Sequence, residues 1–497
     1  MLSRFILAAV AILATAACSS PTVLPAASGS VAAIPSAASS PSVRPLSTPT
    51  DALLDVDGAS ALEHVAYFAD RARGGRFSGS AGYDAAARYV ADRFKEMGLE
   101  PWGDNGTYFE RFKMSIVDLA ATPVLERRDP DVKRFTHRTD FTERVGGLFG
   151  SGGGEGQLVF IGSGQTTPGA SDFDKVDVRG KIAIVITGGR GDPGRELVAR
   201  GAVGAIYVST GTLLKFSYIS RFESTTIAGV LVTSSVADDL LAPSGRKVAD
   251  LVAAVQAQIR GAGSTPPAPS PAFELPVRLR LSVSLTPVRE IDATNVVGLL
   301  RGTDAEDAKR AVLVGGHLDG VGTDPDGTVF PAANDNASGP ALTIEVARAL
   351  VARRAELRHS IVFTAWAGEE EGLLGSDAFA AQFAASPGRR ESLLGYINLD
   401  VVGCCGGSVS ASTENDGLVQ RVANAAERLN VPFVRGGRGS SDQESFSRRN
   451  VPATLLDWAD IGIIHTTADT LDKVTAERLR TIGRIAALVA LEMAAGR

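Results

Sequence analysis

The sequence predicts an α/β protein whose main domain is a mixed, largely parallel sheet with helices on both faces. Two observations predict this fold class. Over residues 277–497, short apolar runs alternate with helical patterns of ten or more residues, as in βαβ units. Over residues 155–258, short runs rich in β-branched residues alternate with polar turns, which predicts a separate β-rich block.

Composition sets limits on the class of protein. Of the 497 residues, 44% are hydrophobic and 21% are charged, as in soluble globular proteins, which excludes disordered, collagen-like and polytopic membrane chains. The 50 basic and 56 acidic residues give a net charge of −6, so we expect no nucleic-acid partner. Three cysteines are too few for a disulfide framework.

The N-terminus predicts export from the cytoplasm. Arg4 precedes an apolar stretch at residues 5–14, and the small residues before Cys18 resemble a bacterial lipobox, so residues 1–18 are predicted to be a lipoprotein-type signal peptide. The alternative is an ordinary signal peptide cleaved near Ala17, which would give a secreted protein. Residues 19–50 are mostly Ser, Ala, Pro and Thr and are predicted to form a flexible tether. We expect membrane contact only through a lipid on Cys18.

Potential metal ligands follow three apolar runs, at residues 311–316, 360–366 and 394–399. In the order of the runs, these residues are His317 with Asp319, Glu369 with Glu370, and Asp400. Because open α/β sheets bind ligands at the carboxyl ends of their strands, these side chains are expected to share one crevice. Asp335 precedes a helical pattern for which Ser338 is the predicted N-cap, and His465 lies in a polar loop before the last helix.

These residue types point to a particular chemistry. Imidazole and carboxylate ligands without thiolate suit zinc, with cobalt or manganese as possible substitutes. Two histidines and three carboxylates are too many for one tetrahedral site, whereas two ions sharing a carboxylate would use them all and leave room for water. Glu369 and Glu370 are neighbours and should point in different directions, so that one binds metal and the other faces the water.

Five motifs in the same order resemble the di-zinc exopeptidases, a family that includes bacterial leucyl aminopeptidases and glutamate carboxypeptidase. The motifs are GGHLD (315–319), ANDNASG (333–339), AGEEEGLLGS (367–376), NLDVVG (398–403) and IHTTADTLD (464–472). The resemblance spans residues 295–497, and residues 60–112, with GRFSGS at Gly75–Ser80, look like the family's N-terminal part.

The resemblance implies a role for each residue. The metal ligands it implies are His317 and Asp400 for one zinc, Glu370 and His465 for the other, and Asp335 as the bridge. Asp319 would fix the tautomer of His317. Glu369 would be the general base and then the general acid, taking a proton from the attacking water and returning it to the leaving amine.

The middle block, residues 150–260, resembles a protease-associated (PA) domain, and we expect it to be a lid or docking module without chemistry of its own. On this division, residues 51–149 are the N-terminal part of the peptidase domain, residues 261–276 are a linker, and residues 277–497 carry the metal site.

Two positions depart from the family's pattern. Ile464 stands where the family often has Tyr, and Gln443 where it commonly has His. The adjacent Cys404 and Cys405 are predicted to be free thiols rather than a vicinal disulfide, because neighbouring cysteines bond only with strain.

The function predicted from these features is that of a metal-dependent aminopeptidase acting on peptide substrates. A carboxypeptidase or dipeptidase on the same scaffold is the nearest alternative. A glutaminyl cyclase, which has a similar fold but binds a single zinc ion, is a further alternative. The presence of both His317 and Asp400 favours two ions. A non-catalytic binding protein is the alternative from a different functional class.

Overall fold

The computed structural model describes residues 54–186, 193–209, 211–218, 220–261, 268–385, 392–458 and 462–497. The predicted signal peptide, Cys18, the predicted tether and part of the predicted linker lie outside these ranges. Within the described ranges, none of the helices combines the length and apolar character needed to cross a bilayer.

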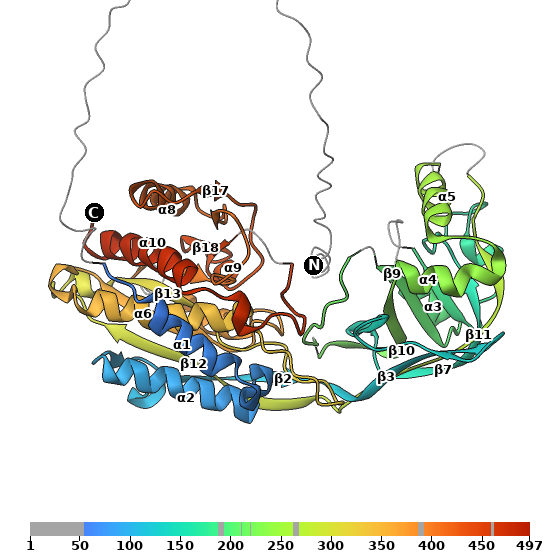
Figure 1. Cartoon of the computed structure of the whole chain (residues 1–497), viewed down its shortest axis with the longest axis horizontal. Coiled ribbons are helices and arrows are strands. Elements are labelled where there is room, and N and C mark those ends of the chain that lie inside the picture. Colours follow the sequence, from blue (N-terminus) through green and yellow to red (C-terminus); the bar gives the residue numbers. More distant parts are fainter. Residues whose placement is uncertain are drawn as a thin grey trace, which may run out of the picture. The chain divides into compact units, whose positions relative to one another are not determined.

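The described residues form two sheets (Figure 1). The first has the strand order β1-β12-β14-β13-β15-β18-β16-β17, and β2 also pairs with β12. Its strands are β1 (Glu100–Pro101), β2 (Phe109–Ile116), β12 (Arg289–Leu300), β13 (Ala311–His317), β14 (Ser360–Trp366), β15 (Leu393–Leu399), β16 (Val409–Ala411), β17 (Phe433–Arg435) and β18 (Ala453–Trp458).

The centre of the first sheet is parallel. β14, β13, β15 and β18 are neighbours and run in the same direction, while β12 pairs with β14, and β16 with β18, in the antiparallel direction. The three apolar runs predicted from sequence are the strands β13, β14 and β15. The predicted mixed sheet is therefore confirmed, with its parallel strands at the centre.

Helices cover both faces of the first sheet. Along β13, Val312 and Val314 pack into a core shared with α1, α2, α6 and α10, whereas Ala311 and Leu313 pack into a second core with α7 and α9. This alternation follows from the two-residue period of a strand. The helices are α1 (Gly58–Ala69), α2 (Ala81–Glu96), α6 (Ser338–Val351), α7 (Leu374–Ala385), α8 (Asp416–Arg428), α9 (Gln443–Ser447) and α10 (Ala476–Ala494).

Side-chain caps fix where several helices begin. Asp57 accepts the backbone N–H of Ala59 before α1, Ser80 accepts that of Tyr83 before α2, and Thr475 accepts that of Arg478 before α10. Each bond satisfies a donor that the first helical turn leaves free.

The second sheet has the order β4-β3-β11-β7-β8-β9-β10-β5, and β6 pairs with β10. Its strands are β3 (Leu119–Asp129), β4 (Lys133–Arg134), β5 (Phe141–Arg144), β6 (Gly147–Phe149), β7 (Gly152–Phe160), β8 (Ile182–Val185), β9 (Gly204–Ser209), β10 (Phe222–Thr233) and β11 (Phe273–Leu285). Three helices accompany it: α3 (Pro193–Ala199), α4 (Ser234–Leu241) and α5 (Val248–Arg260).

This sheet takes strands from outside the range 150–260 predicted for the insertion. β3 comes from residues assigned to the peptidase domain, and β11 begins within the predicted linker 261–276. β11 pairs with both β3 and β7, and its residues alternate between buried and exposed, with Leu275, Val277 and Leu279 buried. That alternation is the pattern of a half-buried strand, which the prolines nearby obscured in the sequence. The identity of this part as a PA domain stays a prediction.

Candidate metal centre

Five of the predicted residues meet in two groups that share one carboxylate. His317, Asp335 and Asp400 form one group, and Asp335, Glu370 and His465 form the other. In the first, the Nε2 atom of His317 lies 3.4 Å from Asp335 and 3.3 Å from Asp400. In the second, the Nε2 atom of His465 lies 3.1 Å from Asp335 and 3.3 Å from Glu370.

The sheet places most of these side chains. His317 is the last residue of β13, the turn after β14 carries Glu369 and Glu370, and Asp400 directly follows β15. Parallel neighbours end at the same edge, so residues 30 to 83 positions apart in the chain become neighbours in space. His465 comes from the loop between β18 and α10.

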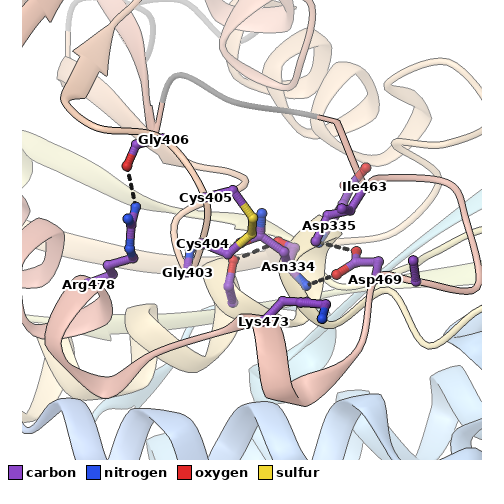
Figure 2. The surroundings of a disulfide bond; sticks show 12 residues. Asn334, Asp335, Gly403, Cys404, Cys405, Gly406, Ile463, Asp469, Lys473 and Arg478 are labelled. Atoms are coloured by element: carbon purple, nitrogen blue, oxygen red, sulfur yellow. Dashed lines mark hydrogen bonds between the residues drawn. A yellow bond between two sulfur atoms is a disulfide. The ribbon is translucent and has the colours of Figure 1, made fainter. Parts of the chain in front are cut away.

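Asp335 lies in an irregular helical turn, Ala333–Ala337, that leads into α6. Figure 2 shows the carboxylate of Asp469 accepting the backbone N–H groups of Asn334, at 2.7 Å, and of Asp335, at 3.0 Å. Ser338 is the first residue of α6 and not its N-cap, because its hydroxyl donates to the carbonyl oxygen of Asn334. The side chain of Asn336 instead accepts the N–H of Gly339.

A buried arginine joins the loops on either side of the centre. Arg76 is fully buried and donates hydrogen bonds to four backbone carbonyls, those of Phe68, Leu318, Pro331 and Ala332. Leu318 follows the predicted ligand His317, and Ala332 precedes the turn with Asp335. Burial lowers the pKa of Arg76 to about 10, while nearby carboxylates, Asp469 first, favour its charge. Sequence analysis assigned no role to Arg76, although this residue lies in the GRFSGS segment.

A second buried network supports Asp400. Ser441 donates to Oδ2 of Asp400 at 2.7 Å and accepts from Asn398 at 2.9 Å. Asn398 in turn accepts from the hydroxyl of Tyr396, which accepts from the indole N–H of Trp366. Sequence analysis did not predict this series of hydrogen bonds, because its residues come from β14, β15 and the loop before α9.

Gln443 belongs to the same network. Its carbonyl oxygen accepts from Asn398 at 3.2 Å, and its side chain is fully buried. Gln443, at the first position of α9, therefore links that helix to Asn398 of β15.

Asp319 supports the turn that carries the two glutamates. Its carboxylate accepts the backbone N–H of Glu369 at 3.4 Å and of Glu370 at 3.2 Å. Its Oδ1 lies 3.7 Å from Nδ1 of His317, which is longer than a hydrogen bond. The predicted control of the His317 tautomer stays a prediction, whereas the contact with the glutamate turn is a role that sequence did not suggest.

The electrostatics of the centre are those of a site that lacks positive charge. Burial disfavours protonation of His317, but the carboxylates of Asp400 and Glu369 outweigh it and hold its pKa well above the usual value. Burial also raises the pKa of Glu369 and of Glu370 well above the usual range for a carboxyl group. Divalent cations would supply the missing charge.

The donor atoms fit such cations. Both histidines turn Nε2 toward the carboxylates, and the buried Oε1 atom of Glu370 has no hydrogen-bond partner among the described residues. Buried polar atoms without partners are uncommon in native proteins and often mark a bound ion or water. Two nitrogen and three carboxylate ligands suit zinc.

Cys404 and Cys405 form a disulfide, so the prediction of free thiols is wrong (Figure 2). The two residues lie in a tight turn in which Val401 and Cys405 have positive φ angles of 56° and 83°. The turn is held on both sides, since Gly403 donates to the side chain of Asn334 at 2.8 Å and Arg478 donates to the carbonyl of Gly406. This fixed turn holds the two sulfur atoms within bonding distance.

Comparison with known proteins finds matches to the part of the chain that forms most of the first sheet. Residues 295–490 match the model of peptidase family M28. A probable zinc metalloprotease from Leptosphaeria maculans is 33% identical over 184 residues, which cover 35% of this chain and 40% of that protein. Leucine aminopeptidase 1 from Arthroderma otae is 27% identical over 207 residues, covering 37% of this chain and 54% of the relative. The chain thus spans about half or less of the length of these curated relatives.

A solved structure resembles a larger part of the chain. The aminopeptidase from Aneurinibacillus sp. strain AM-1 superposes with a TM-score of 0.66 at 22% identity, covering 89% of this chain and 95% of that one. At this identity the likeness establishes the fold alone, and its coverage extends over both sheets.

Proposed function

Because residues 295–490 match the model of peptidase family M28, we propose that the protein is a zinc-dependent aminopeptidase that holds two zinc ions and removes N-terminal residues from peptides. The observation that carries the proposal is the pair of ligand groups that share Asp335. The names of the curated relatives, a zinc metalloprotease and a leucine aminopeptidase, agree with it.

In this proposal, His317 and Asp400 hold one ion, Glu370 and His465 hold the other, and Asp335 binds both. When bound, such ions lower the pKa of water and favour negative charge on a carbonyl oxygen. Glu369 belongs to neither ligand group, and we assign it the proton transfer. Its carboxylate takes a proton from the attacking water and gives it to the nitrogen of the departing amine.

The charges around the centre favour a substrate with a free amino terminus. The nearby basic side chains are already engaged, since Arg76 donates to backbone carbonyls and Lys215 pairs with Asp324. Asp442 is fully buried, and its carboxylate adds to the negative charge of Glu369 and Asp400 near the centre. An ammonium group complements such a carboxylate, whereas the carboxylate terminus that a carboxypeptidase binds would be repelled.

The test compares one peptide with its N-acetylated and C-amidated forms, with and without a chelator. We expect hydrolysis of the free and amidated peptides, none of the acetylated peptide, and loss of all activity with chelator. Cleavage of the acetylated but not the amidated peptide would establish a carboxypeptidase. Cyclisation of an N-terminal glutamine would establish a cyclase, and binding without turnover a non-catalytic protein.

We also propose that the protein works outside the cytoplasm, anchored by a lipid on Cys18. The support is in the sequence: a positive residue, an apolar stretch, small residues before Cys18 and a polar tether after it.

A further inference from the structure

Residues 211–218, which follow β9 of the second sheet, reach the candidate metal centre. The backbone N–H of Lys215 donates to the carbonyl oxygen of His465 at 3.0 Å. The ring of Phe216 lies edge-on to the ring of His465, with centroids 5.1 Å apart and an interplanar angle of 75°. The part of the chain expected to have no role in chemistry thus contacts a predicted metal ligand.

Buried charges fix this segment in place. Lys215 is only 2% exposed, and its ammonium lies 3.1 Å from Oδ1 of Asp324, in the loop that follows Asp319. Arg138, in the loop between β4 and β5, donates to both oxygens of Asp324, at 2.7 and 2.9 Å. Separating buried partners would leave unpaired charges at a high cost in free energy. Residues 211–218 therefore have a defined position beside His465.

Phe216 differs from its neighbours in exposure. Its side chain is 55% exposed, whereas Lys215 and Tyr218 are buried. A single exposed aromatic residue is ordinary in a soluble protein. This one is unusual in its contact with a predicted metal ligand, because a peptide held at the centre would lie next to His465.

A cavity of about 540 Å³ is lined by His465 and by residues 211–213 of this segment. Leu213 lines it from the segment, Phe330 from the first sheet's loops, and Ile463 from the loop that carries His465. These apolar side chains would contact an apolar substrate side chain favourably.

We propose that residues 211–218 form one wall of the substrate-binding site, and that Phe216 contacts the substrate side chain next to the scissile bond and selects for apolar residues. The inference rests on the proposed function, because it places a peptide at the metal centre. It assigns a specificity-determining residue to the second sheet.

The test measures kcat and KM on leucyl, phenylalanyl and glycyl amides for wild type, Phe216→Ala and Phe216→Leu, together with zinc content. We expect Phe216→Ala to lower kcat/KM about 10- to 100-fold for the two large substrates and little for the glycyl one, with zinc unchanged. Phe216→Leu should restore much of the loss. Val132→Ala, which alters a 69% exposed side chain in the turn between β3 and β4, is the matched control and should have no effect.

A second measurement does not depend on turnover. Leucine hydroxamate and glycine hydroxamate carry the same zinc-binding group, so the ratio of their dissociation constants reports the side-chain contact alone. We expect Phe216→Ala to reduce that ratio about tenfold or more. An unchanged ratio, or an equal loss on all substrates accompanied by zinc loss, would overturn the inference. If wild type cleaves no peptide but Phe216→Ala still lowers the hydroxamate ratio, the proposed function is wrong. The contact between Phe216 and the side chain of the ligand is then still supported.

Discussion

At the scale of single residues, Glu369 and Glu370 are adjacent and chemically alike, yet they have different surroundings. Only Glu370 belongs to a ligand group, 3.3 Å from Nε2 of His465. We expect Glu370→Ala to lose zinc, and activity as a consequence. Glu369→Ala should keep both ions and a similar KM but lower kcat by about 10²- to 10⁴-fold, the usual contribution of general acid–base catalysis. Steady-state kinetics and elemental analysis at saturating zinc check this.

Two results would contradict that assignment. If Glu369→Ala loses zinc and Glu370→Ala retains it, the roles of the pair are reversed. If Glu369→Ala keeps a near-normal kcat, another group takes the proton.

Glu110 gives a residue-scale prediction about pH and stability. Burial raises its pKa to about 7, while the hydrogen bond from Asn295 opposes the rise. The folded state then binds a proton that the unfolded state releases near pH 4.5, so this group makes stability fall as pH rises from 4.5 to 7. Glu110→Gln removes the titration and keeps an acceptor for Asn295. We expect the variant to gain up to about 3 kcal/mol relative to wild type across that window.

Urea unfolding of both proteins at pH 4.5, 6 and 7.5 measures the gain. A difference in unfolding free energy that stays constant across these pH values would show that Glu110 ionises normally in the folded protein.

The position of a residue in the site could be predicted from sequence only where neighbouring residues in the chain indicate it. His317, Glu370 and Asp400 each follow an apolar run in the chain, so their positions at strand ends could be predicted. Arg76 contacts Leu318 and Ala332 across more than 240 residues of sequence, and nothing near it in the chain indicates those partners. Such a residue becomes visible only in the folded structure.

At the scale of elements, β13, β14 and β15 could be predicted because they are buried on both faces and therefore read as continuous apolar runs. β11 alternates instead and lies among prolines, so it was taken for a linker and the start of the next domain. The disulfide was missed for a different reason. It depends on the backbone of the turn after Asp400, which residue types alone do not determine.

The turn that contains Cys404 and Cys405 leads to a prediction about reduction of their disulfide. A trialkylphosphine attacks the sulfur of the exposed Cys405, the S–S bond breaks, and water converts the adduct to phosphine oxide and two thiols. The closed loop is so short that global stability should change by only about 1 kcal/mol. The turn follows Asp400, and Gly403 supports Asn334 beside Asp335. We therefore expect zinc affinity to fall by up to about tenfold. This is the lower end of the loss usually seen when residues that support metal ligands are changed.

Competition with a chromophoric chelator measures the zinc affinity before and after reduction. A Cys404→Ser/Cys405→Ser variant, treated in the same way, reports any effect of the phosphine itself. Equal affinity in the oxidised and reduced wild type would show that the disulfide does not support the centre.

At the scale of the whole molecule, the sequence predicts that Cys18 attaches the folded part to a membrane. Residues 19–50 carry one charge and no hydrophobic period, so they supply no membrane affinity of their own. We expect Cys18→Ser to move the protein from the membrane fraction to the soluble fraction or to block its maturation. Fractionation and mass spectrometry of the mature N-terminus check this. A mature wild-type chain that begins after residue 18 without lipid would establish ordinary secretion.

The number of ions is the other property of the whole molecule, because their ligands come from the ends of three strands and from two loops. One tetrahedral ion accepts four ligands at most, and the two groups hold five residues. We expect about two zinc ions per purified chain. Asp400→Asn should lose one of them preferentially, whereas Asp335→Asn should weaken both, since Asp335 belongs to both groups. Elemental analysis after gel filtration measures each content. A single tightly bound ion with full activity would contradict the two-zinc proposal and favour the cyclase.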